Sequence, residues 1–417
     1  MNTDIKLSTR FHQAQGAHEV GVLVTLAGEA PAKRPRINVA LVLDRSGSMA
    51  GAPLDAAKQA LTRFATFLAP QDHVTIAVFD SEASLVYGPG PADHEAIRAA
   101  LARIQSQGQT NLSGGWLLGR QHVQAALGDG TNRVVLFTDG HANRGIMDIT
   151  QLVGLARGAA EGRVSTTCIG FGPQFNEDLL STMADAGSGN YWYVENTDQM
   201  GDIFTDEIEG LVALGAQNVS IEVRASHPKV QGVSFPQSFA ISRTADGGWL
   251  ARIGDLYATT PRSLGVILHV EDVGTLGETR LAEVKVTADV LTPQGIEHRV
   301  ITMPVVANIS GNDQLEPVVE STLLRYAAAK TREEAMRVAD RGDLPGAAEL
   351  LERASESLRA CKDQESIDES ADLREQAVRL RERRYESEDR KYNLASSRAS
   401  FEDKMAYLKR MKRGKGQ

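Results

Sequence analysis

Three short polar segments carry the residue types that could do chemistry in this chain. Residues 44–48 read DRSGS and directly follow an apolar run, residues 108–112 read GQTNL and precede a helical pattern, and residues 138–140 read TDG at the end of another apolar run. Loops that follow the strands of an open α/β sheet meet at one edge, where such sheets bind ligands. We therefore expect these three segments to form one site.

The side chains of these segments favour a hard divalent cation. Two carboxylates and three hydroxyls are available, from Asp44, Ser46, Ser48, Thr110 and Asp139, with no sulfur or imidazole among them. Such oxygen ligands select Mg²⁺ or Mn²⁺ in preference to Zn²⁺. Because the set carries few charges and Mg²⁺ tends to keep exchangeable positions, an Asp or Glu of a partner protein could complete the coordination.

These five residues, in this order, resemble the metal-ion-dependent adhesion site of von Willebrand factor type A domains. The resemblance covers roughly residues 37–214. It implies that the two serines coordinate the metal directly, the threonine directly or through water, and the aspartates often through water. It also implies Mg²⁺ as the ion, with Mn²⁺ or Ca²⁺ as alternatives.

The wider layout resembles bacterial proteins similar to the inter-alpha-trypsin inhibitor heavy chains and the calcium-activated chloride channel homologues. Bacterial proteins of this kind often work beside MoxR-type AAA+ ATPases or in other multi-gene systems, so the resemblance implies that class of partner. The leading interpretation is thus a cation-dependent protein–protein interaction module. At the rim of its site we expect Arg45, Asn111 and His141 to meet the partner.

Two other interpretations compete with this one. Taken singly, each segment could be a helix cap or a turn, since Ser and Asp often follow strands in those roles. The alternative function is a Mg²⁺-dependent hydrolase or phosphatase. The sequence contains no phosphate-binding G-x-x-x-x-G-K-[ST] loop and no G-x-S-x-G around the serines, and His141 lies too close in sequence to Asp139 to form a triad. We therefore predict that the chain is not an enzyme and has no catalytic residues.

The pattern of apolar residues predicts the elements that position this site. Near-continuous apolar runs at 37–44, 73–80, 133–140 and 164–172, and a shorter run at 191–196, alternate with amphipathic helical patterns. Strands covered by helices on both faces have this composition. The fold class expected here is α/β, a doubly wound and mostly parallel sheet, joined to an antiparallel β-sandwich and a C-terminal helical region.

Four regions follow from these patterns. Residues 37–214 form the α/β domain and residues 215–311, which alternate apolar and polar residues, form the sandwich. The strands of residues 1–36 alternate in the same way and are expected to join that sandwich. Residues 312–417 form the helical region, which ends in a basic tail that begins at Lys404 and is expected to be solvated and frayed.

Composition limits the possible functions. The chain has 417 residues and a net charge of -9, which argues against a general nucleic-acid binder. Two cysteines cannot build a disulfide framework. No apolar stretch approaches the roughly 18 residues of a membrane span, and the N-terminus lacks a secretory pattern, so we expect a cytoplasmic protein.

Overall fold

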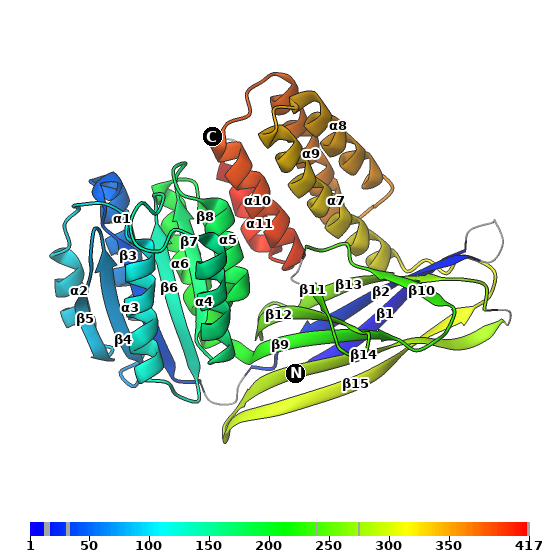
Figure 1. Cartoon of the computed structure of the whole chain (residues 1–417), viewed down its shortest axis with the longest axis horizontal. Helices are drawn as coiled ribbons and strands as arrows, with labels where there is room; N and C mark the ends of the chain where they lie inside the picture. The colour runs from blue at the N-terminus through cyan, green and yellow to red at the C-terminus, as the bar shows by residue number, and fades with distance from the viewer. Residues whose placement is uncertain (12–16, 31–33, 239–240, 274–275, 415–417) are drawn as a thin grey trace.

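A computed structural model describes residues 1–11, 17–30, 34–238, 241–273 and 276–414 (Figure 1). The chain forms an α/β domain, a sandwich of two antiparallel sheets and a helical region, and the last two helices of that region lie between its other helices and the α/β domain. The expected fold class is therefore confirmed.

The α/β domain has a six-stranded sheet in the order β5-β4-β3-β6-β7-β8. Its strands are β3 (Ile37–Asp44), β4 (His73–Phe79), β5 (Ala83–Pro91), β6 (Thr131–Thr138), β7 (Ser165–Phe171) and β8 (Ser188–Val194). Neighbouring strands are parallel except for the edge pair β4 and β5. All residues of β3 and β6 are buried, as expected for strands covered by helices on both faces.

Helices lie on both faces of this sheet (Figure 1). They are α1 (Ala52–Thr66), α2 (His94–Ala102), α3 (Leu112–Ala125), α4 (Ile149–Glu161), α5 (Glu177–Ala186) and α6 (Thr197–Val212), with a short 3₁₀ turn at Gly47–Met49. Helix α1 packs beside α6, and α4 packs beside α5. Asn and Asp side chains cap most of these helices, which fixes where each begins.

The β-sandwich is built from strands that precede the α/β domain in the sequence and strands that follow it. One sheet has the order β1-β2-β13-β10 and the other β11-β12-β9-β14-β15. The strands are β1 (Asn2–Phe11), β2 (His18–Ala27), β9 (Leu214–Ala225), β10 (Val230–Ser234), β11 (Ile241–Arg243), β12 (Trp249–Tyr257), β13 (Arg262–Val270), β14 (Gly277–Thr292) and β15 (Gly295–Ile309). Because β2 pairs with β13 along its whole length, the N-terminal strands lie in the same sheet as strands that follow the α/β domain.

The helical region contains α7 (Pro317–Asp340), α8 (Leu344–Ser357), α9 (Gln364–Arg381), α10 (Ser387–Phe401) and α11 (Met405–Gly414). Asp343 caps α8, its carboxylate accepting from the backbone N–H of Gly346 at 2.9 Å, after Gly342 ends α7 in a left-handed conformation. Among the described residues, no helix combines the length and apolar character needed to cross a membrane.

The start of the basic tail differs from the expectation of a solvated, frayed terminus. Tyr407, Leu408 and Met411 of α11 are buried in the core of the α/β domain. The Tyr407 hydroxyl accepts from the backbone N–H of Tyr193 at 3.0 Å and donates to its carbonyl at 2.9 Å, so both backbone groups of this edge-strand residue have a partner. Arg410 pairs with Asp206 on α6. The side chains of Lys412 and Arg413, and all of Lys415, lie outside the described residues.

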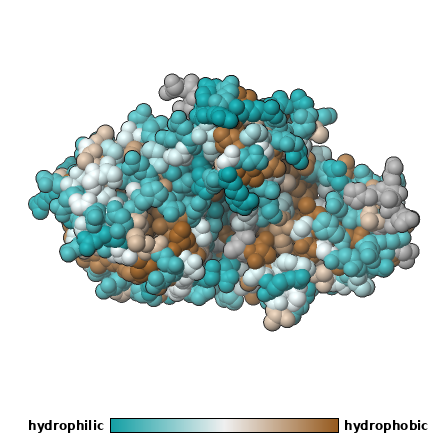
Figure 2. All heavy atoms as spheres, turned by 45° about the horizontal axis from the view of Figure 1, so that its top comes forward, coloured by the Kyte–Doolittle hydropathy of each residue, from teal (hydrophilic) through white to brown (hydrophobic). Residues whose placement is uncertain are grey.

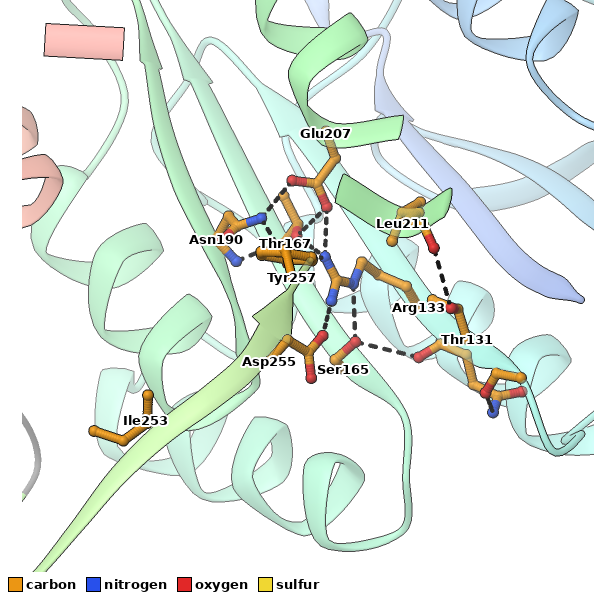
Figure 3. Close-up of polar contacts among 12 residues, drawn as sticks. Thr131, Arg133, Ser165, Thr167, Asn190, Glu207, Leu211, Ile253, Asp255 and Tyr257 are labelled. Atoms are coloured by element: carbon orange, nitrogen blue, oxygen red, sulfur yellow. Dashed lines mark hydrogen bonds and ion pairs between the residues drawn. The ribbon is translucent and has the colours of Figure 1, made fainter. Parts of the chain in front are cut away.

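A buried ionic network joins the α/β domain to the sandwich (Figure 3). Arg133, on β6, is fully buried, and its Nη1 lies 2.8 Å from Glu207 Oε1 on α6. Its other terminal nitrogen pairs with Asp255 on β12, and Tyr257 of the same strand accepts a hydrogen bond at 3.1 Å. Since an unpaired charge would be costly at this depth, the network fixes how the two domains meet.

Candidate metal centre

The three polar segments meet at the carboxyl edge of the parallel sheet. Asp44 is the last residue of β3 and is completely buried. One of its carboxylate oxygens accepts from the backbone N–H of Ser46 at 2.8 Å, and the other accepts from the hydroxyl of Thr138, the last residue of β6. The deepest carboxylate of the site is therefore held in place by both neighbouring segments.

The hydroxyls of Ser46 and Ser48, in the loop after β3, connect the region around Asp44 to Asp139 in the third segment. Ser46 Oγ lies 3.2 Å from Ser48 Oγ, and Ser48 Oγ donates to Asp139 Oδ1 at 2.7 Å. Ser46 and Asp139 are buried, whereas Ser48 is exposed. Four of the expected ligand residues therefore form a connected set that opens to solvent at Ser48.

Thr110 completes the set from the loop before α3. A Cβ placed on Gly140 would lie 3.4 Å from Thr110 Oγ1 and 3.5 Å from Ser48 Oγ, so both hydroxyls flank this glycine. The backbone N–H of Thr110 donates to Asn143 Oδ1 at 2.9 Å, and its carbonyl accepts from the N–H of Asn143 at 3.1 Å. The structure thus brings all five expected ligand residues together.

The two carboxylates are held where negative charge is unfavourable. Burial raises the pKa of Asp44 to about 6, against the hydrogen bonds from Thr138 and Ser46, and the nearby charge of Asp139 raises it further. Burial also raises the pKa of Asp139, although the hydrogen bond from Ser48 opposes this. A cation bound between these groups would favour their charged forms.

The expected rim residues have different surroundings. Arg45 is half-buried, and its Nε donates to Asp80 Oδ2 at 2.7 Å, so its charge is paired within the chain. Asn111 is the N-cap of α3, with its side-chain oxygen accepting from the N–H of Gly114 at 3.0 Å. His141 is exposed on the loop after β6. Of the three, His141 is the exposed residue, whereas Arg45 and Asn111 are half-buried and hydrogen-bonded within the chain.

Sequence reasoning missed two residues that shape the site. Thr138 stands in the quoted TDG segment, but the pattern gave no sign that its hydroxyl would hold Asp44. Asn143 lies in an exposed loop and carries no motif, yet it fixes the backbone of Thr110. Among the described residues there is no group of three or more His, Cys, Asp or Glu side chains suited to a metal ion.

Comparison with known proteins assigns the domain that carries this site. Residues 38–206 match the model of the von Willebrand factor type A domain. The chain contains a von Willebrand factor type A domain. All five candidate ligand residues lie within the matched range of this type A domain.

Similar proteins extend the likeness beyond the type A domain. The uncharacterized protein sll0103 of Synechocystis sp. is 26% identical over 340 residues, which cover 78% of this chain and 79% of that protein. Inter-alpha-trypsin inhibitor heavy chain H1 of Bos taurus is 31% identical over 168 residues, but these cover 38% of this chain and 18% of the heavy chain. The resemblance to the heavy chains is therefore confirmed for one region, and the chain spans less than a fifth of that relative.

Solved structures show that the whole layout recurs. A von Willebrand factor type A protein from Catenulispora acidiphila has a TM-score of 0.67 at 17% identity and covers 91% of this chain and 89% of its own. The ArnB paralog VWA2 from Sulfolobus acidocaldarius has a TM-score of 0.62 at 14% identity, covering 96% of this chain and 98% of its own. At these identities the likeness concerns the fold alone.

Proposed function

We propose that the type A domain is a divalent-cation-dependent protein-binding module. Domains of this family are typically metal-dependent interaction modules. The observation that carries the proposal is the convergence of Asp44, Ser46, Ser48, Thr110 and Asp139 into one set of oxygen donors that opens to solvent. Hard oxygen donors of this kind suit Mg²⁺ or Mn²⁺.

The residues of the site would contribute two kinds of oxygen donor to a bound cation. Ser46, Ser48 and Thr110 would supply neutral oxygens. The buried carboxylates of Asp44 and Asp139 would supply negative charge from the protein interior. A bound divalent cation would retain positive character and accept a carboxylate from a partner. The exposed Ser48 and His141 would then border the partner's acidic residue. Nothing in the geometry or the comparisons favours the Mg²⁺-dependent hydrolase.

The cation can be tested before any partner is known. Titration of the full chain with Mn²⁺ should show one tight site, and Ser46→Ala or Thr110→Ala should weaken it because each removes one oxygen donor. Ser84→Ala is the matched control, since Ser84 is an exposed serine on β5. Equal Mn²⁺ affinity in wild type and in both site variants would disprove the assignment.

The partner can be tested by capture with and without chelator. A MoxR-type AAA+ ATPase, the class implied by the resemblance, is the first candidate to mix with the purified chain. Binding should require the cation, and replacing the contacting Asp or Glu of the partner by its amide should weaken it, because an amide binds a hard cation more weakly than a carboxylate. Metal-dependent hydrolysis of a phosphate ester that disappears in Asp139→Ala would instead support the enzyme.

A further inference from the structure

A second cleft lies between the type A domain and the sandwich, away from the candidate metal centre. Its volume is about 270 Å³, and it is lined on one side by the end of α4 and the start of β8, and on the other by β9 and β12. Ser188, the first residue of β8, lines this cleft, whereas Asp44 is the last residue of β3. Because both strands belong to the parallel part of the sheet, the cleft and the metal centre lie at opposite edges.

Two arginines enter the lining of the cleft from different domains. Arg157 comes from α4 of the type A domain and Arg252 from β12 of the sandwich, and both are exposed. Within the described part of the chain, neither side chain has an ion-pair or hydrogen-bond partner. Arg163, which lines a small adjoining pocket, instead has its Nη1 3.8 Å from Asp129 Oδ1. Two guanidinium groups thus remain available, and their planar donor sets match phosphate oxygens.

The backbone of both walls adopts uncommon conformations at this cleft. Ser188 of β8 and Asn218 of β9 both line the cleft and have φ values of 55° and 53°, and Gly254 of β12 has a φ of 84°. Non-glycine residues with a positive φ carry backbone strain, and such residues cluster at ligand-binding sites. The pairing of β12 with β9 shifts register between Arg252 and Gly254, and such bulges redirect side chains.

The charge and size of the cleft indicate what it would hold. Among its described lining residues, Glu161 is the single carboxylate against the two arginines, so the lining is net positive. Its volume of about 270 Å³ is slightly below the roughly 300–1,000 Å³ of most small-molecule sites, so it suits only a small ligand. We propose that this cleft binds a small ligand carrying a phosphate group, clamped by Arg157 and Arg252 from the two domains.

Inorganic phosphate is the first probe, added to the full chain without divalent cations. It should raise the melting temperature more than potassium chloride at the same ionic strength, because a ligand that binds the native state stabilises it. Arg157→Gln and Arg252→Gln should each weaken phosphate binding by at least about tenfold, since each loses charge-assisted hydrogen bonds. Glu161→Gln should strengthen binding, because it removes the opposing charge.

Matched variants separate the cleft from general charge effects and from the metal centre. Arg103→Gln, at an exposed arginine at the end of α2, should leave phosphate affinity unchanged, and so should Asp44→Asn. Glycerol 2-phosphate as a second probe distinguishes a site for phosphate esters from one for free phosphate; tighter binding of either supports the proposal. Phosphate affinities that are equal in wild type, Arg157→Gln and Glu161→Gln, with all three folded by circular dichroism, would overturn it.

Discussion

Replacing Asp44 by asparagine should stabilise the metal-free protein at neutral pH while removing its response to divalent cations. The pKa of Asp44 is raised by burial from the ordinary 3.8 to about 6. Raising the pKa from 3.8 to about 6 corresponds to roughly 3 kcal/mol of free energy in favour of the protonated form. Since the folded state holds this proton more tightly than the unfolded state, the contribution to stability is present below about pH 4 and is lost as pH rises through about 6.

Urea denaturation in EDTA, followed by tryptophan fluorescence, measures this effect. Trp116 and Trp192 are buried in the type A domain and report its unfolding. At about pH 7.5 Asp44→Asn should be more stable than wild type by up to about 3 kcal/mol, and at about pH 4 the two should be equal. Mg²⁺ at about 100 times its dissociation constant should add about 2.7 kcal/mol to wild type and nothing to the variant.

Two outcomes would refute this reasoning. If wild type and Asp44→Asn have the same stability at neutral pH in EDTA, burial does not penalise the carboxylate as the structure indicates. If the variant gains as much from Mg²⁺ as wild type does, the cation binds elsewhere. Asparagine suits this test because it can still accept from the N–H of Ser46, while Thr138 can turn its hydroxyl to accept.

Three further changes test how the domains are held together. Tyr407→Phe should cost about 1–3 kcal/mol of unfolding free energy in chemical denaturation, because both backbone groups of Tyr193 lose their partner. Arg133→Met should cost about 3–5 kcal/mol in the same assay, because it leaves the buried carboxylate of Glu207 without its charge partner. Asp403→Asn should gain stability over wild type as pH rises above about 6, as measured by melting temperature against pH, because burial raises the pKa of Asp403 to about 6 and its charged form is unfavourable in the folded state.

The sequence predicted the α/β core because its signals are local. The run at 37–44 is apolar throughout, and the structure has β3 at Ile37–Asp44 with every residue buried. Strand β5 was not predicted, since Ala83–Pro91 is half exposed, contains Gly and Pro, and lies at the sheet edge. The pattern of a buried strand is strong because both faces are covered, and an edge strand lacks it.

The convergence of the site residues was also predictable, but their surroundings were not. Order and spacing indicated that Asp44, Thr110 and Asp139 would meet. Arg45 was expected at the rim of the site, and only the fold reveals that Asp80, 35 residues along the chain, pairs with it. The same limit applies to the basic tail. Arg410 was expected to be solvated, because the local sequence does not indicate that Asp206 on α6 pairs with it.

The order of elements has a consequence for synthesis of the chain. Strand β2 must pair with β13, in which Arg262 lies opposite Leu26, but the whole type A domain is translated between them. At about 5–20 residues per second, the ribosome takes on the order of tens of seconds to reach β13. During that interval β2 lacks its partner β13, whereas the type A sheet, whose last strand ends at Val194, has all of its strands before Arg262 is made. The nascent chain should therefore fold from its middle outward, and a chaperone that acts on it would be expected to hold the first 27 residues.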